Sequence, residues 1–371
     1  MHLIVIKMIE AKADTLFEVS WEVCNKVGGI YTVIRSKSSE MLKYYKNYFF
    51  IGPYFPQMAI REFYPEAPPD NLKKVIENLK RDGIILLYGR WLINKRPLTL
   101  LIDFSKFMDR KNDIKAKLWQ DYKIDSLYTE KDFDEPVVWA TSVGMVLEEL
   151  ANVFKGKLVA HFHEWLSSAG ILYIKKKNLN IKTVFTTHAT VLGRSFASAN
   201  IDFYCFQGNK CHLERIDIEK EAYNLGVSAK HQLERISVER CDVFTTVSEI
   251  TGMEAKYILK RSPDVLVPNG LDTFGLPNQE EIPIKHRIFK EKIKDFIIPY
   301  FFPFYSFDLD NTLFYFLSGR YEFRNKGIDI TIKALSLLNE RLRKKQSDKT
   351  IVVFFFVPNA IKIIHPEFLE S

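Results

Sequence analysis

The sequence has few cysteines and no long hydrophobic run. Its 371 residues include four cysteines without CxxC spacing or a disulfide framework: Cys24, Cys205, Cys211 and Cys241. Such cysteines are typical of reduced thiols in a cytosol. No stretch reaches the roughly 18 apolar residues that a membrane-spanning helix needs, and the apolar run before Lys7 is too short for a secretory signal. We therefore expect a cytoplasmic protein with no membrane partner.

The sequence also lacks a basic block and a low-complexity linker. Lys and Arg number 53 against 46 Asp and Glu, so the formal net charge is +7 and is spread along the chain. This mild excess favours phosphate-bearing partners, but without a basic cluster nucleic acid is not an expected partner. The 47% hydrophobic and 27% charged residues exclude a mainly disordered chain.

Short apolar runs alternate with longer amphipathic segments, which predicts βαβ units and a parallel sheet in an α/β fold. The expected strands are Leu16–Trp21, Tyr48–Ile51, Ile84–Tyr88, Leu158–His163, Val184–His188, Val243–Val247, Thr312–Leu317 and Thr350–Val357. The expected helices are one from Ile30, Trp165–Lys177, Ile216–Arg240, Glu280–Asp295 and one after Gly327 with an apolar face. A further helix follows Ser248, where Thr251 and Glu254 fit a capping box.

The length predicts more than one domain, because single hydrophobic cores stop growing at about 250–300 residues. The best candidate boundary is Val267–Gly270, which ends a strand. Residues 1–268 suffice for a doubly wound, Rossmann-like domain with helical insertions. Residues 269–371 leave room for roughly two βα units, so we expect the second Rossmann-like domain to be incomplete.

Ligands of open parallel sheets bind beyond the carboxyl ends of the strands. The loop after the first strand holds Lys26, Gly28 and Gly29, directly before a helix. Paired glycines let a backbone approach an anionic group, and the helix offers its N-terminal amides. The same pair is also compatible with an ordinary tight turn.

Two further strands end in histidines that a right-handed crossover brings to one edge of the sheet. His161, His163 and Glu164 follow one strand, and His188 ends the next. H-x-H can form a metal pair, but no third ligand stands at a characteristic spacing, so we expect backbone or sugar contacts and no metal. His188 as a neutral donor and Arg194 as a cation would suit a hydroxylated, anionic ligand.

The loop Gly319–Gly327 holds three cations, Arg320, Arg324 and Lys326, between a buried strand and a helix. A run of charges like this is also compatible with an ordinary solvated surface loop. The position of this loop favours a ligand-binding role, because the loop lies at the edge of the second sheet where ligands of parallel sheets bind. Arg offers a fork for a diphosphate and Lys a point charge, which together stabilise a leaving group that departs with negative charge.

The segment from Phe307 to Leu313 resembles the nucleophile motif of haloacid dehalogenase phosphatases through Asp308 and Asp310. In that family the first aspartate attacks phosphorus and the second transfers a proton. Only 58 residues follow, and Pro299 and Pro303 interrupt the strand that the motif requires upstream. We therefore do not expect a phosphatase of this kind.

Eight segments in order resemble the eukaryotic-type glycogen synthases: FEVSWEVCNKVGGIYTVIRSK (17–37), YGRWLI (88–93), VAHFHEWLSSAGI (159–171), FTTHATVLGR (185–194), DVFTTVSEIT (242–251), ILKRSPD (258–264), VPNGL (267–271) and GRYEFRNKG (319–327). The resemblance covers nearly the whole chain. It implies a GT-B fold, in which two doubly wound parallel-sheet domains face a cleft.

The resemblance also implies an activity, which is the retaining transfer of glucose from UDP-glucose to the non-reducing end of an α-1,4-glucan. No cofactor or metal is expected, and a glycogenin-like primer protein is a further implied partner. The site residues carried over are Lys26, Gly28 and Gly29 beside the nucleotide, His188 and Arg194 at the donor, Arg320 and Lys326 at the diphosphate, Glu164 on the acceptor side, and His286 and Lys290 in a glucose 6-phosphate switch.

The sequence departs from the family after Ala360. The acid-rich segment with a catalytic glutamate, the uridine-binding residues and an arginine cluster are absent, and HPEFLES resembles a segment that normally lies far downstream. We therefore expect a shortened synthase, and we do not assume that it forms the oligomer of the family. Two alternatives stay open. One is a catalytically impaired remnant that binds nucleotide sugar, glucan or a full-length synthase, and the other is a starch synthase that uses ADP-glucose.

Overall fold

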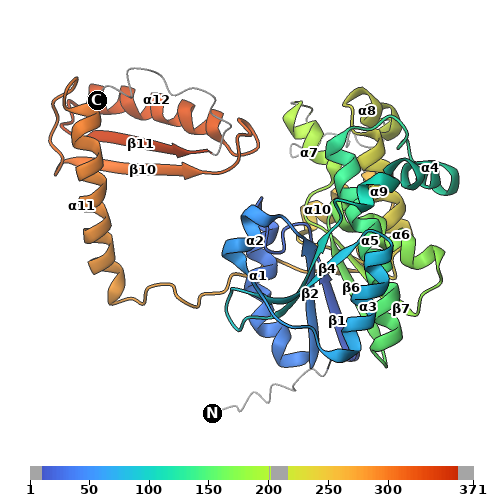
Figure 1. Cartoon of the computed structure of the whole chain (residues 1–371). Helices are drawn as coiled ribbons and strands as arrows, with labels where there is room; N and C mark the ends of the chain where they lie inside the picture. The colour runs from blue at the N-terminus through green and yellow to red at the C-terminus, as the bar shows by residue number, and fades with distance from the viewer. Residues whose placement is uncertain (1–10, 200, 202–215, 358–371) are drawn as a thin grey trace, which may run out of the picture. The chain divides into compact units, whose positions relative to one another are not determined.

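The computed structural model describes residues 11–199, 201 and 216–357 (Figure 1). Cys205, Cys211 and the HPEFLES segment lie outside these residues. The chain forms two compact units: unit 1 comprises residues up to Phe196 and 202–272, and unit 2 comprises 197–201 and 273 onward. From the sequence we placed the boundary at 268.

Unit 1 is built on one nine-stranded sheet with the strand order β3-β4-β5-β2-β1-β6-β7-β8-β9. The strands are β1 (Thr15–Val19), β2 (Asn47–Pro53), β3 (Phe63–Pro65), β4 (Ile85–Trp91), β5 (Leu98–Asp103), β6 (Leu158–His163), β7 (Ile181–Thr187), β8 (Val243–Thr246) and β9 (Val265–Leu266). Seven neighbouring strands, from β5 to β9 across the centre, pair in parallel. The predicted strands of this unit are confirmed within a few residues.

The other edge of the sheet corrects the sequence analysis. β4, expected as one of the parallel strands, pairs antiparallel with β5 and with β3. A short turn joins β4 to β5, and its Lys95 and Arg96 have φ angles of 64° and 44°. Because this turn is too short for a crossover helix, the two strands must run in opposite directions.

Helices cover both faces of the sheet, with α1 and α2 on one side and α3, α5 and α6 on the other (Figure 1). The helices that begin in unit 1 are α1 (Gly29–Tyr44), α2 (Pro56–Glu62), α3 (Asp70–Arg81), α4 (Lys111–Tyr122), α5 (Lys131–Val153), α6 (Trp165–Lys176), α7 (Val191–Ser198), α8 (Ile218–Asn224), α9 (Ser228–Arg240) and α10 (Glu249–Ile258). Among the described residues, no helix combines the length and the apolar character needed to cross a membrane.

The predicted capping box of α10 is wrong. The helix begins at Glu249, two residues before Thr251, and Ser248 is its N-cap, because the Ser248 hydroxyl accepts a hydrogen bond from the Thr251 N–H over 3.1 Å. Glu254 is buried and binds Thr190 instead. The two side chains of the expected box therefore have different roles, one at the helix start and one in a tertiary contact.

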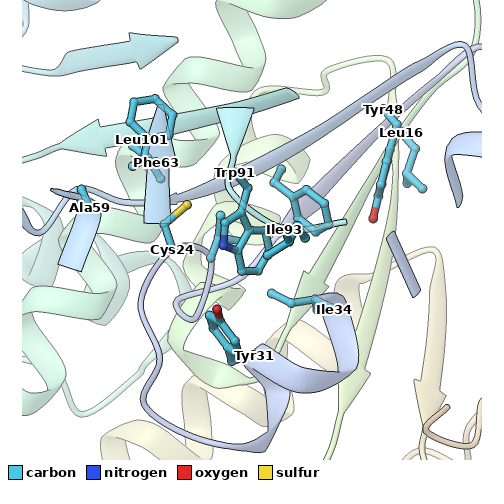
Figure 2. Packing of buried hydrophobic residues seen from close by; sticks show 12 residues of the cluster. Leu16, Cys24, Tyr31, Ile34, Tyr48, Ala59, Phe63, Trp91, Ile93 and Leu101 are labelled. Atoms are coloured by element: carbon cyan, nitrogen blue, oxygen red, sulfur yellow. The ribbon is translucent and has the colours of Figure 1, made fainter. Parts of the chain in front are cut away.

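An aromatic cluster packs α1 onto the sheet (Figure 2). Trp91 is fully buried and meets Phe50 and Tyr31 edge-on, with ring centroids 5.1 Å and 5.4 Å away. The Trp91 indole and the Tyr31 hydroxyl both donate to Glu62, over 2.9 Å and 2.7 Å. These hydrogen bonds offset the cost of removing the polar atoms of the two large side chains from water. The cluster fixes the start of α1 beside the end of β1.

Unit 2 contains α11 (Glu281–Phe301), β10 (Thr312–Ser318), α12 (Ile328–Lys344) and β11 (Thr350–Phe356). β10 and β11 pair in parallel in the register Thr312 to Thr350, with α12 as the crossover. The strands and helices predicted for this part of the chain are confirmed. The described part of unit 2 thus holds one βαβ element and one additional helix.

We expect Gly144→Ala to destabilise unit 1. A Cβ at Gly144 in α5 would lie 2.6 Å from the Cβ and Cγ of Tyr173 in α6, and overpacking of this kind costs about 1–3 kcal/mol. Tyr173 can yield little, because these atoms adjoin its backbone. Thermal unfolding followed by circular dichroism should show a lower transition temperature. In the matched variant Gly29→Ala the new Cβ meets no atom within 4 Å, and the transition should stay near that of the wild type; an equal loss in both would contradict the packing argument.

Candidate active site

The candidate site of unit 1 lies at the carboxyl ends of three adjacent parallel strands, β1, β6 and β7. Glu18 pairs in register with His161, and His163 pairs with Thr186. Because parallel strands end at the same edge of a sheet, acid, histidine and hydroxyl side chains meet there. His188 follows directly after β7 and joins them.

Glu18 is the centre of this group and is fully buried. Its carboxylate accepts hydrogen bonds from Lys37 Nζ over 2.6 Å, from the Tyr48 hydroxyl over 3.1 Å and from His163 Nε2. Burial raises the pKa of Glu18, but Lys37, His161 and His163 together hold it well below its ordinary value. The group therefore contains a buried, charged carboxylate paired with the ammonium of α1.

The three histidines extend the hydrogen-bond network that begins at this ion pair. His163 Nδ1 lies 3.1 Å from His188 Nε2, and His161 Nε2 lies 2.6 Å from the Thr186 hydroxyl. Burial, together with the neighbouring His163 and Lys37, lowers the pKa of His188 to about 3. Burial also lowers the pKa of both other rings. All three imidazoles are thus neutral at physiological pH.

The same group was weighed from the sequence as a metal pair. Glu18, His161 and His163 offer ligand atoms within 4.8 Å of one another. Lys37 Nζ lies 2.6 Å from the Glu18 carboxylate and 3.3 Å from His161 Nδ1, so an ammonium already occupies the position of a cation. The remaining acceptor of His163 faces His188. This donor set suits a lysine better than a metal ion.

Glu164 holds the turn that presents His188. Its carboxylate accepts hydrogen bonds from the backbone N–H groups of His188 and Ala189, over 2.9 Å and 3.1 Å. Glu164 itself has φ 64° and ψ 164°, a conformation that costs a side-chain-bearing residue about 1–3 kcal/mol. From the sequence we assigned Glu164 to the acceptor side, which stays a prediction; in the structure its contacts position the His188 backbone.

Two more buried carboxylates bind the same turn from other helices. Glu234 in α9 accepts the Thr187 hydroxyl over 3.3 Å and the Val191 N–H over 3.0 Å. Glu254 in α10 accepts the Thr190 N–H over 3.1 Å and the Thr190 hydroxyl. Burial raises the pKa of both Glu164 and Glu234 above the ordinary value, and the positive charge of Arg194 in α7 opposes this rise. The turn between β7 and α7 is therefore fixed by three acids and one base.

The glycine turn before α1 is bound by a carboxylate of the protein itself. The Glu22 carboxylate accepts hydrogen bonds from the N–H groups of Gly28 and Tyr31, over 2.9 Å and 2.7 Å. A Cβ at Gly28 would lie 2.9 Å from this carboxylate, whereas one at Gly29 would meet nothing within 4 Å. Two of the amides expected to cradle a phosphate are thus already bonded. Lys26 lies over the Tyr31 ring, 5.8 Å from its centroid.

The histidines open onto a pocket of about 360 Å³ within unit 1. One wall is the histidine group and Lys37, and another is the loop after β9, which includes Asn269 and Gly270. The predicted residues His161, His163 and His188 are therefore brought together with a segment about 80 residues later in the chain. The lining of the pocket is mainly apolar, with the polar groups of the histidines and Lys37 in one wall, as is common in small-molecule sites.

In unit 2 the loop Gly319–Gly327 follows the carboxyl end of β10 and leads into α12, as predicted. The guanidinium of Arg320 is 45% exposed and pairs with Glu322 over 2.9 Å. A Cβ at Gly319 would lie 3.2 Å from the Cγ of Lys326, so both cations belong to one end of the strand. Gly327 has φ 70° and forms the N-cap of α12.

The structure excludes the phosphatase motif. Asp308 and Asp310 lie before β10, at its amino end, whereas the catalytic aspartates of that motif follow a strand. Asp308 accepts the backbone N–H of Asp310 over 2.9 Å, and Asp310 pairs with Lys294 over 2.7 Å. These contacts give the two aspartates a role in a surface turn.

His286 and Lys290 share one face of α11 and line a groove of about 820 Å³ within unit 2. Most of the other lining residues are apolar, among them Phe296, Phe314 and Phe354. Lys290 Nζ lies 5.9 Å from the centroid of the Phe314 ring. The assignment of these residues to a glucose 6-phosphate switch stays a prediction, and the groove itself supplies mainly aromatic surface.

Sequence reasoning missed Glu18, Lys37, Glu234 and Glu254. A glutamate within the apolar segment from Leu16 to Trp21 was a visible signal, because a buried strand carries a charge only when it is paired. Its partner Lys37 lies 19 positions later on a helix, and no local spacing identifies it. The acids of α9 and α10 resembled solvent-exposed or capping residues, and only the tertiary packing buries them.

Comparison with known proteins agrees with this architecture. The trehalose 6-phosphate synthase of Burkholderia multivorans superposes with a TM-score of 0.50 at 10% identity and covers 96% of this chain and 68% of that one. The fold is that of the GT-B glycosyltransferases, with an incomplete second domain. The family model "Glycogen synthase" matches residues 18–371, and the chain belongs to this family.

Individual relatives support the assignment. The chain is 40% identical over 359 residues to the liver glycogen [starch] synthase of Homo sapiens and 39% identical over 355 residues to isoform 2 of Saccharomyces cerevisiae. The matches cover 96% and 92% of this chain but 50% of each relative. The chain thus spans about half the length of the curated relatives it matches.

We expect Glu234→Gln to remove part of the pH dependence of stability. Burial and the neighbouring Glu164 and Glu254 raise the pKa of Glu234 well above 4.5, so the folded protein retains a proton that the unfolded chain releases. The free energy of unfolding therefore falls as the pH rises from about 4.5 through the raised pKa. Glutamine can donate to the Thr187 hydroxyl and accept from the Val191 N–H without charge.

Unfolding temperatures measured from pH 5 to 8 should fall less steeply for Glu234→Gln than for the wild type. The variant should be the more stable protein at the upper end of this range. Glu239→Gln, an exposed residue of the same helix, serves as the control and should leave the pH profile unchanged. Parallel profiles for wild type and Glu234→Gln would show that Glu234 does not titrate differently on folding.

Proposed function

We propose that this chain transfers glucose from UDP-glucose to the non-reducing end of an α-1,4-glucan, with retention of configuration. The observation that carries the proposal is the polar group at the carboxyl edge of the unit 1 sheet, in segments that the glycogen synthase family model matches. The printed names of the relatives, which are glycogen [starch] synthases, support the substrate class. The protein then acts in the cytoplasm, on a glucan that a glycogenin-like protein primes.

In this reaction the bond between glucose C1 and the diphosphate breaks, and its electron pair leaves with UDP. A bond forms between C1 and a hydroxyl oxygen of the glucan, whose proton is released. The negative charge that develops on the diphosphate needs cations, and Arg320 and Lys326 supply them at the end of β10. His188 and Arg194 contact the donor in unit 1.

The remaining site residues have subsidiary roles in the proposal. Lys26 lies beside the nucleotide, at the turn formed by Gly28 and Gly29. Since Glu22 already occupies two amides of this turn, the cation of Lys26 contributes more than the helix terminus does. The proposed reaction uses no metal, and the bonding of the carboxylate and imidazole groups at the edge to Lys37 and to each other supports this part of the proposal.

The activity is tested by incubating the purified chain with radiolabelled UDP-glucose and glycogen. Label should appear in precipitated glucan, and addition of a chelator should not reduce it. A parallel reaction with ADP-glucose should incorporate less label. Binding of UDP-glucose without incorporation would identify the chain as a catalytically impaired remnant, and preference for ADP-glucose would indicate a starch synthase.

We expect Arg320→Ala to weaken UDP binding. A hydrogen bond between a guanidinium and a phosphate contributes about 1.5–3 kcal/mol, so the dissociation constant measured by calorimetry should rise about 10- to 150-fold. Arg324→Ala, in the same loop and equally cationic, should change it little. Glu322→Gln should preserve or improve binding, because it releases Arg320 from its ion pair. An unchanged affinity for Arg320→Ala would mean that the loop is only a solvated connection.

A further inference from the structure

The histidine group at the end of β6 and β7 has a defined set of hydrogen-bond directions. Glu18 is ionised and can only accept, so every nitrogen or hydroxyl bonded to it must donate. His163 Nε2 is bonded to Glu18 and therefore carries the proton of the neutral ring. His163 Nδ1 is left as an acceptor, and the atom facing it at 3.1 Å is His188 Nε2. His188 must then carry its proton on Nε2.

The same rule determines the proton position on the neighbouring ring, His161, which faces Lys37. The Lys37 ammonium can only donate, and it lies 3.3 Å from His161 Nδ1. His161 Nδ1 also lies 3.4 Å from a carboxylate oxygen of Glu18, but its hydrogen bond is with Lys37. His161 therefore carries its proton on Nε2, which donates to the Thr186 hydroxyl over 2.6 Å. The Thr186 hydroxyl then donates to Thr245 over 2.6 Å. One ion pair thus determines the proton position on every ring of the group.

The other nitrogen of His188 is available to a ligand. Nδ1 has no hydrogen-bond partner among the residues that the structure describes, and it is not one of the buried unsatisfied nitrogens. The His188 ring also lines the pocket of about 360 Å³. Its backbone is held by Glu164 and its Nε2 by His163, so both the position and the orientation of the ring are constrained.

We infer that His163, anchored by Glu18, is a positioning residue that holds His188 with its proton on Nε2 and presents Nδ1 to the pocket as a hydrogen-bond acceptor. This changes the role assigned to His188 from the sequence, where the ring was taken as a donor. An acceptor nitrogen binds a hydroxyl group and is repelled by an unprotonated phosphate oxygen. On the proposed function, His188 recognises a hydroxyl of the transferred sugar, and the cations recognise the diphosphate.

The low pKa of His188 agrees with this assignment. Burial of the ring lowers the pKa most, His163, Lys37 and Arg194 add to this effect, and Glu18 opposes it. Protonation of Nδ1 would create a cation beside these groups. The ring therefore stays neutral, and its acceptor remains available, over the physiological pH range.

The proton positions can be measured directly without a ligand. Histidine labelled with ¹⁵N in the full chain gives signals from eight rings, and those of His163 and His188 are assigned from His163→Gln and His188→Gln. We expect a proton bound to His188 Nε2 and a scalar coupling across the hydrogen bond to an unprotonated His163 Nδ1. His161→Gln, which removes a neighbouring ring, should leave this coupling intact. A proton on His163 Nδ1, or no coupling between the two rings, would overturn the inference.

A binding measurement tests the consequence for the ligand. His163→Phe keeps a ring of similar size but has no polar atom, so it removes the acceptor that orients His188 together with the donor toward Glu18. Calorimetry should show a loss of UDP-glucose affinity of about three- to tenfold, the size of one neutral hydrogen bond, with unchanged affinity for UDP. An equal loss for both ligands would indicate general structural damage and contradict the positioning role. If the wild type binds neither ligand, the proposed function fails, and the ¹⁵N measurement still decides the proton positions.

Discussion

The buried ion pair between Glu18 and Lys37 is the constraint on which the unit 1 site depends. Glu18 could not remain charged at the end of an otherwise apolar strand alone, because an unpaired buried ion is strongly destabilising. Lys37 reaches Glu18 from α1, and α1 is held against the sheet by the aromatic cluster around Trp91. The packing of the core thus determines where the ammonium lies, and the ammonium determines the proton positions on the histidines.

Around this ion pair the fold places three acids against the turn between β7 and α7. Glu164, Glu234 and Glu254 come from three different elements and bind the backbone and hydroxyl groups of residues 187–191. Each carboxylate replaces water that would otherwise solvate the turn. Because burial removes these carboxylates from water, the pKa values of Glu164 and Glu234 are raised. These hydrogen bonds within the protein constrain the backbone of the turn.

Much of the fold followed from hydrophobic pattern alone. Runs such as Leu158–His163 and Thr350–Phe356 have the length and the β-branched or aromatic content of buried strands, and they formed as predicted. The antiparallel edge was not predictable in this way, because the turn from β4 to β5 uses Lys95 and Arg96 at positive φ where a glycine or asparagine would have been the signal. α5 was missed because Pro136 lies inside it and nearly all its faces are apolar.

The site was predictable as a location but not as a set of interactions. Strand-end histidines, paired glycines and the cationic loop after β10 all lie at the carboxyl edges of their sheets. The direction of each hydrogen bond, however, depends on charges that lie far away in the sequence. His188 could be read as a donor from the residues alone, and only the contact chain from Glu18 through His163 reverses that reading.

The two units differ greatly in how firmly they hold their candidate residues. The histidine group of unit 1 is surrounded by buried side chains, whereas in the described part of unit 2 the buried hydrophobic residues are Ile297, Ile328 and Val352. Phe316 and Phe356, on the strands of its sheet, are 74% and 57% exposed. A two-stranded sheet of this kind is marginally stable by itself. Arg320 and Lys326 therefore depend on the less firmly packed unit, and their charge, more than a fixed geometry, is what they can contribute to a diphosphate.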